Sequence, residues 1–157
     1  MILVMTISTH TAIGAAIGFA VGNPILGFII GFTSHFILDT IPHGDSKISD
    51  NLRVHKKKKG AFTYGTIDGV VAIYIILLLT PISKETSELA FSAAIAGSIL
   101  PDLLVGLHDL TKSKFLKPIN DLHFFFHDFF VKKHGDIKLP TALLGQVVLI
   151  AIIMTQI

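Results

Sequence analysis

Residues 9–39 read THTAIGAAIGFAVGNPILGFIIGFTSHFILD and contain no Asp, Glu, Lys or Arg before Asp39. In the middle of this segment, Gly22-Asn23-Pro24 combines a helix stop, a turn and a proline suited to the first position of a helix. Pro42 then disfavours helical geometry in the residue before it, so the second helix should end there. The segment therefore predicts a tight hairpin of two apolar helices over residues 8–41.

The rest of the chain has the same apolar character. Of its 157 residues, 51% are hydrophobic and only 15% are charged, whereas soluble domains average about 25% charged residues. Further runs without Asp, Glu, Lys or Arg cover residues 69–83, 89–101 and 139–157. There is no cysteine, which excludes disulfide scaffolds and thiolate chemistry. The composition predicts an all-α, polytopic integral membrane protein built as a helical bundle.

We expect one membrane domain over residues 1–157, with about five transmembrane helices and a Phe-rich helix at the membrane interface. Its expected parts are the hairpin 8–41, a polar loop 42–61, helices 61–80 and 89–104, a polar region 106–138 that includes the Phe-rich helix near residues 119–131, and a C-terminal helix 139–157.

The basic residues predict an orientation. Loops 42–61 and 106–138 hold six Lys or Arg each, whereas the turn 81–88 holds one. By the positive-inside rule, both long loops and the N-terminus are expected in the cytoplasm. The net charge of +2 is too small to indicate nucleic-acid binding, so the expected partner is the lipid bilayer.

Small and ionisable residues recur at four-residue spacing, which places each set on one helix face. The sets are His10, Gly14, Gly18 and Gly22; Gly27, Gly31, His35 and Asp39; and Ala90, Ala94, Ser98 and Asp102. Small residues let helices approach closely, so the two glycine rows predict the contact seam of the hairpin. A turn near Asn23 then brings His10 close to His35. The ionisable ends of the sets gather at the cytoplasmic end.

The Phe-rich segment adds the sharpest single feature, because His123 and His127 at i and i+4 can place two imidazoles on one metal ion. Carboxylates from Asp39 and Asp102 would complete a mixed nitrogen and oxygen set, with His35 and His10 as further ligands. Such a set suits a divalent metal, with Zn favoured and Mn or Fe as alternatives.

Simpler structural interpretations stay open for each of these residues. His10 could cap a helix, and His35 and Asp39 could form a hydrogen bond within one helix. The His123/His127 pair could form the solvent-exposed face of a helix at the membrane interface. Asp68, in the first turns of the third helix, is expected to be a buried partner of another group rather than a metal ligand. In a hydrolase it would be a catalytic base or a group that orients a ligand. We expect three other histidines, His43, His55 and His108, to be solvated in or beside loops.

Four short blocks together resemble the small bacterial membrane-bound metal-dependent hydrolases, a family that includes the LexA-regulated inner-membrane hydrolases. The blocks are Thr9-His10, Ser34-His35-x3-Asp39, Leu100-Pro101-Asp102 and His123-x3-His127. The residue types are also similar, more distantly, to the metal set of zinc-dependent phospholipases C. An alternative alignment sets His55 against the family's His-rich loop. The resemblance implies a helical protein of a prokaryotic cytoplasmic membrane with a metal site.

The leading hypothesis is thus a membrane-embedded, metal-dependent hydrolase that acts on a lipid-like phosphoester at the cytoplasmic interface. The alternatives are a non-enzymatic handler of metal ions or protons and a helical scaffold with structural His–Asp pairs. A second copy of the chain is a further candidate partner.

Overall fold

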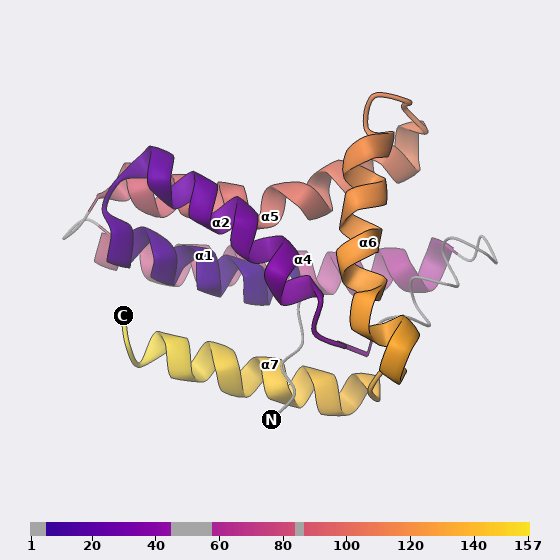
Figure 1. The fold of residues 1–157 in the computed structure, drawn as a ribbon. Coiled ribbons are helices and arrows are strands. Elements are labelled where there is room, and N and C mark those ends of the chain that lie inside the picture. The colour runs from indigo at the N-terminus through magenta and orange to yellow at the C-terminus, as the bar shows by residue number, and fades with distance from the viewer. Residues whose placement is uncertain (1–5, 45–57, 84–86) are drawn as a thin grey trace.

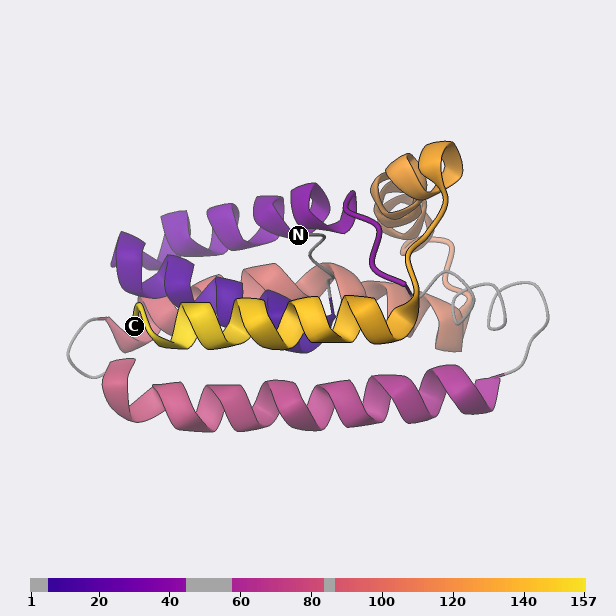
Figure 2. The same cartoon turned by 90° about the horizontal axis from the view of Figure 1, so that it is seen from below.

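The computed structural model describes residues 6–44, 58–83 and 87–157, and this part of the chain contains six α-helices and no β-strand (Figure 1). The helices are α1 (Ile7–Val21), α2 (Pro24–Asp39), α4 (Lys58–Ser83), α5 (Glu88–Thr111), α6 (Lys117–His134) and α7 (Leu139–Met154). The prediction of an all-α protein is confirmed. Figures 1 and 2 show α6 crossing one end of the other helices, which are α1, α2, α4, α5 and α7 and run roughly along one direction.

The hairpin turns at the residues that carry the turn signal. Gly22 ends α1 with a φ of 64°, in the left-handed region that glycine adopts without strain, and its N–H donates to the carbonyl of Gly18. Asn23 then caps α2 by accepting a hydrogen bond from the N–H of Leu26, and Pro24 occupies the first turn. This geometry returns α2 alongside α1.

The glycine rows of the hairpin do not pack on each other, contrary to the expected seam. A Cβ at Gly14 or Gly18 would collide with the backbone of α5, and a Cβ at Gly31 would collide with the carbonyl of Ala94. The small residues of α5, Ala90, Ala94 and Ser98, are fully buried. Helix α5 therefore lies in the groove between α1 and α2, and all three rows of small residues meet there.

Only two of the described helices are long and apolar enough to cross a membrane, residues Phe62–Ser83 of α4 and Glu88–Thr111 of α5. Helices α1, α2 and α7 have 15, 16 and 16 residues. At 1.5 Å per residue these are about 24 Å long or less, short of the roughly 30 Å hydrocarbon core. The expectation of five spans is therefore not supported. The uncharged runs overstated helix length because they include capping and turn residues.

Helix α5 also extends seven residues beyond the expected end at 104, to Thr111. Pro101 lies inside it, because a proline removes one backbone hydrogen bond without necessarily ending a helix whose sides are packed. The first part of the expected polar region 106–138 is consequently helical.

Helices α4 and α7 flank the three packed helices, and Figure 2 shows α4 along the edge of the bundle opposite α2. Ile75 and Leu79 of α4 form a small hydrophobic core with residues of α1 and α5, which are Ala12, Ala15, Phe91 and Ile95. Ile150, Ile153 and Met154 of α7 pack against this core. The outer face of α4 is apolar and exposed, with Ile67, Ile73 and Leu77 each more than half exposed. An exposed apolar face of this length is typical of a helix in contact with lipid.

Candidate metal centre

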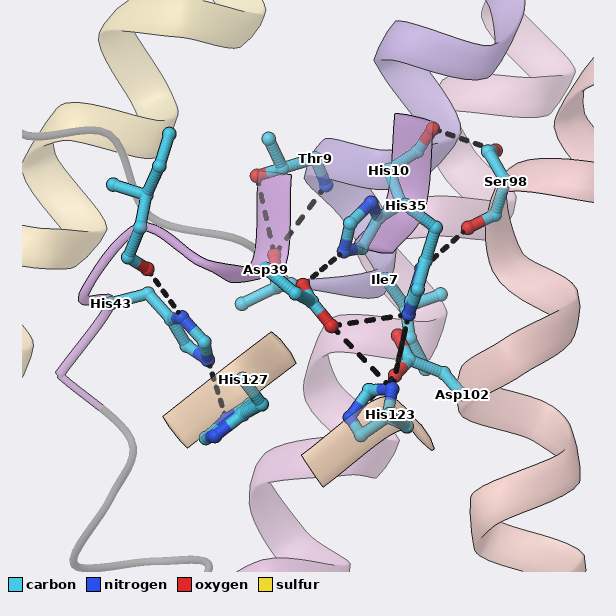
Figure 3. A network of polar contacts seen from close by, with 12 residues as sticks. Ile7, Thr9, His10, His35, Asp39, His43, Ser98, Asp102, His123 and His127 are labelled. Carbon is cyan, nitrogen blue, oxygen red and sulfur yellow. Dashed lines mark hydrogen bonds and ion pairs between the residues drawn. The ribbon is translucent and has the colours of Figure 1, made fainter. Parts of the chain in front are cut away.

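Four ionisable side chains from three helices converge where α6 crosses the bundle (Figure 3). His35 and Asp39 come from the last turns of α2, Asp102 from the middle of α5, and His123 from α6. One ligand atom from each residue lies within 4.8 Å of the others. The prediction that these four residues gather at one end of the molecule is confirmed.

Asp39 lies at the centre of the group. Its Oδ2 is 3.1 Å from Nε2 of His35 and 3.5 Å from Nδ1 of His123. Asp102 lies further out, with its Oδ1 3.7 Å from Nε2 of His35 and 3.9 Å from Nε2 of His123. The side chain of Asp102 is 23% exposed and that of His35 is 0% exposed. The group is therefore closed on the His35 side and accessible beside Asp102.

The orientation of His35 is set by a backbone group. Its Nδ1 lies 2.8 Å from the carbonyl oxygen of Ser98, which can only accept, so Nδ1 carries a proton and donates. Its Nε2 then faces Asp39, and also lies 3.2 Å from Nδ1 of His123. A histidine whose other nitrogen is held by a carbonyl is the usual arrangement of a metal-binding imidazole.

The donor chemistry of the group fits a divalent cation. Two carboxylates lie close together, and Asp39 is only 3% exposed, so the group requires a compensating positive charge, which either a protonated His35 or a bound cation supplies. Burial lowers the pKa of His123, which favours the neutral imidazole that a metal ion binds. Two imidazole nitrogens with two carboxylate oxygens form the mixed set that Zn, Mn and Fe accept.

His10 lies beside the group and supports it. Its Nε2 is 2.9 Å from the other oxygen of Asp39, Oδ1, and its ring stacks on that of His35 with 4.1 Å between the ring centroids. The predicted proximity of His10 and His35 is confirmed. His10 contacts Oδ1 of Asp39, whereas His35 and His123 face Oδ2. His10 therefore holds the Asp39 carboxylate in place without occupying the oxygen that faces the other ligands.

Asp68, a residue of α4, lies apart from the group and contacts the start of α1. Its Oδ2 accepts a hydrogen bond from the N–H of Ile7 at 2.8 Å, and its Oδ1 accepts one from the N–H of Ser8 at 3.2 Å. A carboxylate at this place satisfies backbone donors of the first turn and complements the helix dipole. Asp68 thus joins α4 to α1, while its proposed role as a base stays a prediction.

His127 also lies outside the group of four. Its Nε2 is 2.8 Å from Nε2 of His43, a residue of the segment after α2. His43 was expected to be solvated, but it is only 3% exposed, and its ring lies against that of His127 of α6. His108 is partly covered, with 16% of its side chain exposed, and His55 lies outside the described residues.

One contributor to the site carried no clear signal in the sequence, and one residue beside the site was missed although it had a signal. Ser98 acts through its backbone carbonyl, which no sequence motif reveals, and its hydroxyl donates to the carbonyl of His10 at 2.9 Å. His43 could have been found from its place directly after the His35/Asp39 helix. Comparison with known proteins adds no neighbour: no family model, characterised protein or solved structure matches the chain.

Proposed function

We propose that the chain is a membrane-bound, metal-dependent hydrolase that cleaves a phosphoester in a lipid-like substrate. The observation that carries the proposal is the convergence of His35, Asp39, Asp102 and His123 from three helices on one buried point. Such a group is expensive to bury unless a cation compensates it, and this one is open on one side only. The resemblance to small bacterial membrane hydrolases supports the same reaction class.

Each residue has a part in this proposal that follows from its position. His35 and Asp39 are the rigid ligands, because Ser98 and His10 hold them from behind. His123 brings a neutral imidazole from α6. Asp102 has the longest distances and the most exposure of the four, so one of its oxygens would complete the metal site while the other is placed to accept a proton from water. A divalent metal bound there supplies a Lewis acid that activates water and polarises a phosphoryl oxygen.

The surroundings of the group favour a substrate with an apolar chain. The same helix that brings His123 exposes Phe125, Phe129 and Phe130, which are 61%, 50% and 38% exposed. Aromatic residues on a helix next to a bilayer can lie among acyl or prenyl chains while the polar face meets head groups. A lipid could therefore present its phosphate beside Asp102 without leaving the membrane.

We also propose a location in the cytoplasmic membrane of a prokaryote, with the metal centre and the long polar loops on the cytoplasmic side. Two helices are long and apolar enough to cross a membrane, which is compatible with this location. Among the described residues, Lys112, Lys117, Lys132 and Lys133 are exposed around α6, at the same end as the metal centre. Basic residues at one end favour the cytoplasmic side by the positive-inside rule.

Phosphate release tests the proposal directly. The protein, purified in mild detergent and supplied with Zn²⁺, should hydrolyse at least one of a panel of phospholipids and prenyl diphosphates. Asp39→Asn and His123→Ala should each lower turnover by at least about 100-fold, since residues that merely support metal ligands already cost about 10 to 100-fold. His134→Ala is the matched control, because His134 is an exposed histidine of the same helix.

Equal turnover in the wild type and in Asp39→Asn would contradict the assignment. Zn²⁺ entry into proteoliposomes in the absence of any hydrolysis would favour the handling of metal ions instead.

A further inference from the structure

A second pair of histidines lies beside the metal centre and is not used by it. His43 and His127 are 3% and 4% exposed, and their Nε2 atoms are 2.8 Å apart. Their rings meet edge to face, with 4.4 Å between the centroids. Figure 3 shows the pair next to the group of four, with His127 one helical turn along α6 from His123.

The protons of the two rings can be assigned from their other nitrogens. Nδ1 of His43 lies 2.9 Å from the carbonyl oxygen of Ile41, so it must donate there. Nδ1 of His127 lies 3.1 Å from Oδ1 of Asp128. The other oxygen of this carboxylate, Oδ2, is paired with Nζ of Lys132 at 3.0 Å, so Oδ1 accepts and Nδ1 of His127 donates.

Both neutral rings therefore turn an Nε2 lone pair toward the other ring. Two lone pairs at 2.8 Å repel each other unless a positive species lies between them, and that species is either a shared proton or a metal ion. The Nδ1 partners of the two rings fit the metal ion. A backbone carbonyl on one ring and a carboxylate on the other are the groups that orient metal-binding histidines.

We propose that His43 and His127 bind a second divalent metal ion, of the class that prefers imidazole nitrogen, with Zn²⁺ as the leading candidate. This inference is independent of hydrolysis and of the metal bound by the group of four. Two nitrogens bound to tetrahedral zinc lie about 3.3 Å apart, given zinc–nitrogen bonds of about 2.0 Å. The rings need to separate by only about half an ångström to admit the ion.

The backbone around His43 is built to hold it in place. The N–H of Gly44 donates to Oδ1 of Asp136 at 2.7 Å, which ties this segment to the connection between α6 and α7. Gly44 has a φ of +79°, and a Cβ there would lie 2.8 Å from the Cα of Leu139. The position therefore requires glycine, both for its conformation and for its space. His43 is consequently positioned before any ion binds.

Metal content measured per chain tests the inference without reference to activity. After removal of metal with a chelator and dialysis against Zn²⁺, elemental analysis should give two zinc ions in the wild type. His43→Ala and His127→Gln should each retain one, and so should Asp39→Asn, which disables the group of four instead. His134→Ala, on the same helix but exposed, should retain both ions.

Several outcomes would overturn the second site. Zinc content that is unchanged in both His43→Ala and His127→Gln would do so and would leave the pair sharing a proton. One ion in the wild type that is lost only in Asp39→Asn would do the same. By contrast, one ion that is lost only in the His43 and His127 variants would support this site and remove the group of four. The thermal unfolding midpoint of each metal-free variant is compared with that of the metal-free wild type, which identifies any variant that has not folded. If either His43→Ala or His127→Gln has not folded, the zinc content of the other variant decides whether the second site exists.

Discussion

Glycines in two regions of this protein behave in opposite ways. In α1 and α2, Gly14, Gly18 and Gly31 lie directly against α5, where an added Cβ would meet backbone atoms. In α4, Gly65 and Gly69 have no atom within 4 Å of the place where a Cβ would be. The same residue type therefore marks close packing in one region and an open helix surface in the other.

The difference explains where the metal centre forms. Because three helices approach at their small residues, the carbonyl of Ser98 reaches His35 at 2.8 Å. The same approach brings Asp102 to the ligand group from α5. Helix α4 contributes no ligand to this group, and its outer face is large and apolar. Close packing of backbones thus precedes and permits the chemistry.

The largest effect is expected for Gly31→Val. The added side chain would collide with the carbonyl of Ala94, and backbone atoms of two packed helices cannot move aside cheaply. We expect a loss of about 3 kcal/mol or more in the free energy of unfolding in detergent, above the usual cost of overpacking. Gly65→Val on α4 is the matched control and should change stability little. Similar losses for both variants would erase the distinction between the two regions.

An intermediate effect is expected for Asp68→Ala, which removes the contact between α4 and the start of α1. The N–H groups of Ile7 and Ser8 lose their acceptors, a change comparable to losing a helix cap at about 1 to 2 kcal/mol. Unfolding measurements on the metal-free protein should register this loss. An unchanged unfolding curve together with lost hydrolysis would instead assign Asp68 the role of a catalytic base.

The smallest effect, and one of opposite sign, is expected for Gly65→Ala. Alanine in place of glycine inside a helix stabilises it by about 0.5 to 1 kcal/mol when there is room for the methyl group. Room is available at this position. The midpoint of thermal unfolding should therefore rise slightly, whereas a decrease would mean that another molecule packs against this face of α4.

The sequence was sufficient for the local structure near the hairpin. Turn residues at Gly22, Asn23 and Pro24 act through their own backbone preferences, so they can be interpreted without knowing the fold. The register that follows from this turn correctly places His10 next to His35. Four-residue spacing also correctly places His35 and Asp39 on one face.

Partner choice between helices could not be predicted in the same way. A row of glycines shows that something approaches closely, but it does not show which helix, and α5 took the place expected for the hairpin's own seam. Likewise, the spacing of His123 and His127 suggested one shared ion. The two ring centroids are 5.7 Å apart, but His123 faces Asp39 and Asp102, whereas His127 contacts His43. The segment after α2 that brings His43 there cannot be inferred from the spacing of residues on α6.

Anomalous diffraction at the zinc absorption edge, from crystals grown with Zn²⁺, tests the central claim most directly. The close packing of α1, α2 and α5 should place a zinc ion within about 2.0 to 2.2 Å of a nitrogen of His35 and an oxygen of Asp39, with His123 and Asp102 completing the site. Zinc found only elsewhere on the molecule, or no ordered zinc in well-diffracting crystals, would contradict the assignment of this group as a metal centre.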